Sequence, residues 1–179
     1  MKYIILPIII CLFIYGCKKE KVEPTVNVKL TAEEIPDQES WNSTIFFTDS
    51  GRTRAILNAG HLRVFSNKKE TLLDSNIRVD FYNNEEIHTT TLTAKKGRVD
   101  EKTNNLYAID SVVAVNDSGI VITSDEMMWR NKDRKIVSEK YVKIVSPKEK
   151  IEGYGFESDQ NLRDYIIYNI TYITIADSL

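Results

Sequence analysis

The sequence predicts an all-β domain, and three observations support that fold class. Short runs of alternating apolar and polar residues, rich in Val, Ile, Thr and Tyr, recur along the chain after residue 40. Such runs are typical of half-buried strands. No segment shows a sustained helical period. The third observation is an internal repeat whose units are pairs of strands.

The repeat is clearest in residues 92–115, where two strand-like runs flank a polar turn at residues 101–105. The opening of this unit recurs at steps of about 35, 30 and 29 residues, beginning at Leu57, Leu92, Ile122 and Ile151. Its closing strand recurs in step, at residues 77–81, 112–115 and 142–145. A strand pair cannot bury its apolar face alone, so neighbouring pairs must stack. We therefore predict a stacked β array.

The N-terminal segment predicts export and lipid attachment. Lys2 precedes an almost unbroken apolar run at residues 3–15. This run is shorter than the roughly 20 residues that a membrane-spanning helix needs, and it is typical of a signal peptide. The next residues, Ile14-Tyr15-Gly16-Cys17, resemble the bacterial lipobox. We predict a signal peptide at residues 1–16 and a membrane anchor of acyl chains on Cys17; an ordinary secretory signal with a chance cysteine is the alternative.

Cysteine usage and composition define the next segment. Cys11 lies in the predicted signal peptide, so a mature chain lipidated on Cys17 has no free thiol for a disulfide, a metal cluster or a nucleophile. Residues 17–40 are charged and punctuated by Pro24 and Pro36, which favours a flexible tether. Residues 41–179 remain for one domain of modest size.

Within that domain the elements follow in chain order. Strands are expected at residues 41–49 and 52–65, with polar turns at 50–51 and 67–70. Asp125-Glu126 falls at the repeat position of Lys95-Lys96, so it predicts a turn or bulge. The last run, residues 165–175, is strongly β-forming.

The composition and motifs exclude several classes of function. With 24 basic and 26 acidic residues, the chain lacks the positive charge of a nucleic-acid-binding protein. His61 and His88 lie in different repeat units without cysteine partners, which predicts surface or strand residues and no metal site. Gly153-Tyr154-Gly155 continues to Ser158, so the dinucleotide fingerprint fails. We expect neither catalysis nor a cofactor.

The alternation instead places a set of apolar side chains on one face of the array. These are Ile77, Val79, Phe81, Leu92, Val99, Ile122, Trp129, Val142 and Ile144. Two interpretations stay open. The face forms a filled core, or the sheets stay partly open and admit a lipid acyl chain.

The repeat units together resemble the LptC family of lipopolysaccharide export proteins. The resemblance rests on residues 92–115, 122–129 and 151–159 in order and covers residues 41–175. It implies a twisted, open β-jellyroll. It also implies that the protein receives lipopolysaccharide from an inner-membrane ABC transporter and passes it to a periplasmic bridge protein of like fold. In that case the apolar face binds acyl chains.

The resemblance further implies that the last strand is a docking edge. Its candidate residues are Tyr165, Ile167, Ile170, Tyr172 and Ile173. We expect a periplasmic location, with the anchor in the inner rather than the outer membrane. The family's best-known members have an N-terminal membrane-spanning helix, where this chain has the lipobox. The alternative function is that of an envelope scaffold lipoprotein with a closed β core.

Overall fold

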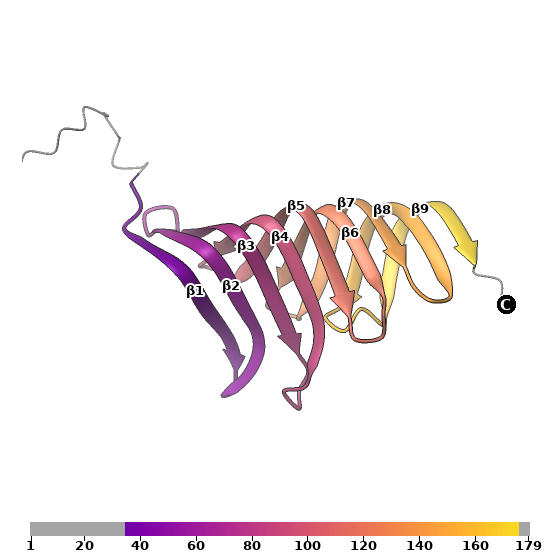
Figure 1. Ribbon diagram of the computed structural model, residues 1–179, viewed down its shortest axis with the longest axis horizontal. Helices are drawn as coiled ribbons and strands as arrows, with labels where there is room; N and C mark the ends of the chain where they lie inside the picture. The colour runs from indigo at the N-terminus through magenta and orange to yellow at the C-terminus, as the bar shows by residue number, and fades with distance from the viewer. Residues whose placement is uncertain (1–34, 176–179) are drawn as a thin grey trace, which may run out of the picture. The chain divides into compact units, whose positions relative to one another are not determined.

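The computed structural model describes residues 35–175, which form one antiparallel sheet of nine strands (Figure 1). The strands are β1 (Gln38–Asp49), β2 (Arg52–Phe65), β3 (Glu70–Tyr82), β4 (His88–Asp100), β5 (Asn105–Asn116), β6 (Val121–Arg130), β7 (Lys135–Val145), β8 (Glu149–Asp159) and β9 (Tyr165–Ile175). Strand order equals chain order, so the sheet is open and β1 and β9 are its edges. The all-β prediction is confirmed.

The N-terminal predictions lie largely outside the described residues. The predicted signal peptide at residues 1–16, the predicted lipidation of Cys17 and the predicted tether as far as residue 34 concern this part of the chain. Strand β1 begins at Gln38, three residues before the predicted start of the domain. In residues 35–175, no helix has the length and apolar character needed to cross a membrane.

The register of the sheet confirms the repeat. Ala114 on β5 pairs with Leu92 on one side and with Ile122 on the other, so the two repeat openings share one row. Leu106 likewise pairs with both Val99 and Trp129. The repeat openings lie on β2, β4, β6 and β8, and the closing runs lie on β3, β5 and β7. Each unit is therefore a hairpin, as predicted.

A line of β-bulges bends the sheet across the middle of its strands. The register shifts after Asp74 on β3, after Ile109 on β5 and after Ser138 on β7. On β3 and β5 the extra residues have left-handed backbone angles, φ 53° to 66°. They are Ser75, Asn76, Asp110 and Ser111. Since a bulge bends its strand, the strands curve together, as Figure 1 shows.

The bend divides every strand into two halves, which form two facing walls. We call the halves beside the β1–β2, β3–β4, β5–β6 and β7–β8 turns the first wall, and the other halves the second wall. Trp129 of the second wall packs against Phe47 and Phe81 of the first, with ring centroids 5.3 and 5.6 Å apart. Because β6 is not next to β1 or β3 in the sheet, these contacts span the interior between the walls.

Glycine permits close strand approach at the bend. A Cβ on Gly60 would lie 2.8 Å from the carbonyl oxygen of Ser75, inside the bulge of β3. A Cβ on Gly153 would meet the carbonyl oxygen of Asn169, where β8 faces the irregular part of β9. Backbone atoms cannot move aside as flexible side chains do, so these two positions require glycine.

We predict that Gly153→Ala lowers the free energy of unfolding by about 1–3 kcal/mol, the usual cost of forcing atoms into a packed site. Chemical denaturation measures it. The control is Gly119→Asn, in the β5–β6 turn. Gly119 has φ +85°, and a Cβ added there would have no neighbouring atom within 4 Å; Asn tolerates left-handed angles. Equal destabilisation by both substitutions would contradict the close-approach explanation.

Candidate functional site

The nine predicted lipid-binding residues all lie on the inner face of the bent sheet. None is more than 7 % exposed, and Val79, Phe81, Ile122, Val142 and Ile144 are completely buried. All nine belong to one hydrophobic cluster that also includes Phe156 and Leu162. Their placement together confirms the alternation, and the interior around them is filled with side chains.

An open cavity of about 900 Å³ continues this interior toward the β7–β9 end. Its apolar lining comes from Ile120, Ile151, Tyr165 and Ile166, and charged residues such as Lys148 and Arg163 also border it. The cavity lies between the β5–β6 and β7–β8 turns of the first wall and the start of β9. This cavity was not predicted from the sequence. The available signal was Ile151, which lines the cavity and begins the repeat unit that matches the others least well.

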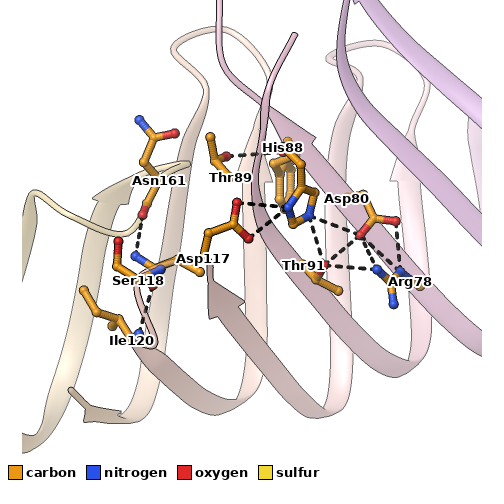
Figure 2. Close-up of polar contacts among 11 residues, drawn as sticks. Arg78, Asp80, His88, Thr89, Thr91, Asp117, Ser118, Ile120 and Asn161 are labelled. Atoms are coloured by element: carbon orange, nitrogen blue, oxygen red, sulfur yellow. Dashed lines mark hydrogen bonds and ion pairs between the residues drawn. The ribbon is translucent and has the colours of Figure 1, made fainter. Parts of the chain in front are cut away.

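Hydrogen bonds also join the two walls, in two groups besides the bond from Tyr165 to Glu149. Arg134, in the β6–β7 turn, donates hydrogen bonds to Asn84 Oδ1 in the β3–β4 turn at 3.1 Å and to Asp49 Oδ2 at the end of β1 at 3.2 Å. The second group comes from residues 159–164, the last residue of β8 and the loop that leads to β9, which we call the strap. Its Asn161 carbonyl accepts a 2.9 Å hydrogen bond from Asn116 Nδ2 at the end of β5 (Figure 2).

The outer face of the first wall carries a polar cluster, shown in Figure 2. The His88 ring lies between two carboxylates, with Nδ1 3.0 Å from Asp117 Oδ1 and Nε2 3.5 Å from Asp80 Oδ1. Arg78 binds Asp80 through two nitrogens, at 2.8 and 2.9 Å. The cluster joins β3, β4 and the β5–β6 turn on the side opposite to the apolar face. Both histidines are strand residues, as predicted.

These acidic and histidine side chains do not form a metal site. Among the described residues, no group of three or more His, Cys, Asp and Glu side chains is placed to hold an ion. The hydrogen bonds of this cluster lower the pKa of Asp80. Burial acts to raise its pKa, but hydrogen bonds from Arg78 and Thr91 outweigh this effect, and the pKa is lowered from its ordinary value of 3.8.

The predicted docking edge, β9, is the last strand of the described sheet. Tyr165 and Ile167 are partly buried against the core, whereas Ile170, Tyr172 and Ile173 are exposed. The Tyr165 hydroxyl donates to Glu149 Oε1 at 2.7 Å. Burial, aided by this carboxylate, raises the pKa of Tyr165 to about 12.

The other edge, β1, was not recognised from the sequence as a candidate. It exposes Trp41 and Phe46 by 64 and 61 %, and Trp41 stacks on His61 with ring centroids 5.4 Å apart. Exposed aromatic residues on an edge strand are an available signal for such a surface.

Fold and site define a class of protein: an open antiparallel sheet bent over an apolar interior, whose end strands β1 and β9 each have one unpaired edge within residues 35–175. The sequence comparisons assign it further. Residues 3–172 match the family described as lipopolysaccharide-assembly, LptC-related. The chain belongs to the LptC family, whose members are non-enzymatic, envelope-associated components of lipopolysaccharide export. A comparison with curated proteins found no match.

We predict that Asp80 stabilises the fold at neutral pH and loses this effect in acid. A carboxyl with a lowered folded pKa contributes stability above its unfolded pKa of 3.8, and that contribution disappears as pH falls through the folded pKa. The difference in unfolding free energy between the native chain and Asp80→Asn, roughly 1 kcal/mol, should therefore be full at pH 7 and shrink below pH 3.8.

Denaturation at several pH values measures this difference. Arg78→Gln removes the main hydrogen-bond donor to Asp80, so the same comparison in that background should depend less on pH. A difference that grows as the pH falls would contradict the assignment.

Proposed function

We propose that this protein binds lipopolysaccharide without chemical change and shields its acyl chains between the two walls of the sheet. The observation that carries the proposal is the continuous apolar inner face, which passes from the filled core into the cavity beside β9. Membership of the LptC family supports lipopolysaccharide as the ligand.

The energetics favour shielding over polar recognition. Each methylene group kept out of water contributes about 0.8 kcal/mol, so one long acyl chain outweighs any single hydrogen bond on the inner face. In the described core, buried polar side chains such as Ser124 and Ser138 already bond to one another, at 3.2 Å. An inner face without strong polar anchors holds lipid evenly, which suits a carrier.

The sheet edges suit transfer between proteins. We propose that the protein receives lipopolysaccharide from an ABC transporter of the inner membrane and passes it to a periplasmic bridge protein of like fold. An unpaired strand with exposed apolar side chains is a template for another sheet. Strand β9 offers such an edge next to the cavity, so the inner faces of both partners would be continuous.

Anchoring completes the proposal. Acyl chains on Cys17 would hold the protein at the inner membrane, on its periplasmic side, because several chains together bind a bilayer stably. The tether would let the sheet stay close to the transporter.

A second candidate function is that of an envelope scaffold with a closed core. The observation that favours it is the complete burial of the inner face around Trp129 and Ile122. A scaffold would pair through its edges and bind no lipid inside.

We predict that photoreactive residues placed at Val79, Ile122 or Val142 crosslink to lipopolysaccharide. The full chain is expressed in cells that produce lipopolysaccharide, irradiated, purified and probed for attached lipid. The outward-facing controls are Arg78 and Lys143, each adjacent in sequence to one of the test positions. The inner positions should label roughly tenfold more strongly, since two shielded methylenes suffice for that ratio.

Equal labelling from both faces would contradict the inner path. A folded protein that labels at none of the five positions would favour the scaffold.

We also predict that a photoreactive residue at Tyr172 on β9 crosslinks to a periplasmic protein of the same fold. The control position is Thr123 on β6, which has paired strands on both sides. The adduct is identified by mass spectrometry. Labelling from Thr123 as strong as from Tyr172 would rule out edge docking.

A further inference from the structure

The strap, residues 159–164, is preassembled around a single carboxylate. Asp159 Oδ1 accepts hydrogen bonds from the backbone nitrogens of Arg163 and Asp164, at 3.1 and 3.4 Å. Asp159 Oδ2 accepts another from Asn161 Nδ2 at 3.0 Å. Both ends of the strap continue into β8 and β9, which are paired there through Ser158 and Tyr165. The strap is therefore a compact unit rooted in the second wall.

Few contacts hold this unit against the first wall. Gln160 Nε2 donates to the carbonyl oxygen of Tyr82, and Asn116 Nδ2 donates to the carbonyl oxygen of Asn161. Asn116 Oδ1 accepts from the nitrogens of Ser118 and Ile120, which orients its amide toward the strap (Figure 2). The remaining attachment is Leu162, whose side chain is completely buried in the core cluster.

The closed position also has costs. Gln160 Oε1 and Asn161 Oδ1 are buried without a hydrogen-bond partner in the protein, and a buried acceptor left unpaired is unfavourable. Leu162 has φ +57°, a left-handed angle that belongs to the turn within the strap. The burial of Leu162 and the two hydrogen bonds to the first wall hold the strap closed, and the two unpaired oxygens partly offset them.

The strap lies at the boundary between the two parts of the interior. Asp159, Arg163 and Asp164 line the open cavity. Leu162 points instead into the filled core that contains the nine apolar residues. Withdrawal of Leu162 would remove an aliphatic side chain from that core and leave space for a ligand beside the cavity.

We propose that the strap is a gate, and that Leu162 occupies the place that an acyl chain of lipopolysaccharide takes when the gate opens. The strap swings as a unit about its junction with β8 and β9, breaks the bonds to Tyr82 and Asn116, and exposes the inner face. This inference rests on the proposed function, because it assumes that the inner face binds acyl chains. It explains how a buried face admits lipid.

The test locks the strap with a disulfide. Asn116→Cys and Asn161→Cys place two thiols where the strap meets the first wall, and the sequence has no cysteine beyond residue 17. The full chain also carries a photoreactive residue at Val142 and is expressed in cells that produce lipopolysaccharide. We expect the oxidised form to lose roughly tenfold or more of its lipid crosslinking, and a reductant to restore it.

The matched control is a disulfide between Asp37→Cys and Ser66→Cys. These residues are also joined by a hydrogen bond, from Ser66 N to Asp37 Oδ2 at 2.7 Å. Both lie away from the strap, where β1 begins and β2 ends. This disulfide should leave crosslinking unchanged in both redox states.

A second variant tests the role of the buried Leu162 side chain. Leu162→Ala removes the aliphatic group that holds the strap closed, so lipid should label Val142 several-fold faster than in the native chain. Circular dichroism shows whether the Leu162→Ala variant is folded. If it is not, the comparison of the oxidised and reduced 116–161 pair decides the test.

The outcomes separate the two proposals. Equal crosslinking of the oxidised and reduced 116–161 pair would overturn the gate while leaving lipid binding intact. Absence of lipid on the native chain, with no strap substitution, would overturn the proposed function and the gate with it.

Discussion

The structure depends on the need to cover one apolar face of a single sheet. A sheet with an apolar face must bury it against another layer, and the described residues contain neither a helix nor a second sheet. The other half of the same strands is the one cover within residues 35–175. The bulges at Ser75-Asn76 and Asp110-Ser111 supply the bend that brings the halves together. Core, cavity and strap all follow from this bend.

Local signals explain which parts of the fold could be predicted. Strand alternation and turn residues act over a few positions, so the hairpin repeat and the bounds of β2 and β9 are visible in the sequence. The repeat offset marked Asp125-Glu126 as a turn or bulge, and these residues lie in an irregular stretch of β6, with Asp125 opposite the bulge of β5. The direction of the bend was not visible, because Ser75, Asn76 and Asp110 are polar residues that also suit an ordinary turn.

The candidate site divides in the same way. Alternation assigns the inner face correctly, but it does not say whether that face is covered. Leu162 lies in a polar sequence, Asn161-Leu162-Arg163-Asp164, that resembles an exposed turn. Its strap meets Tyr82 and Asn116 across 78 and 45 residues of chain, and no local pattern predicts such contacts. A filled core is thus compatible with the proposed binding of lipid on the inner face if the strap moves and withdraws Leu162.

The identity of strand order and chain order has a consequence for how the molecule forms. Within residues 35–175, every backbone ladder joins strands that are adjacent in sequence, so loop closure costs little entropy at each step and contact order is low for an all-β protein. Assembly can begin at any hairpin and spread in either direction, as in other repeat proteins. A lineage could therefore lengthen or shorten such an array by whole hairpins, provided that the contacts of Trp129, Arg134 and the strap between non-adjacent strands are kept or replaced.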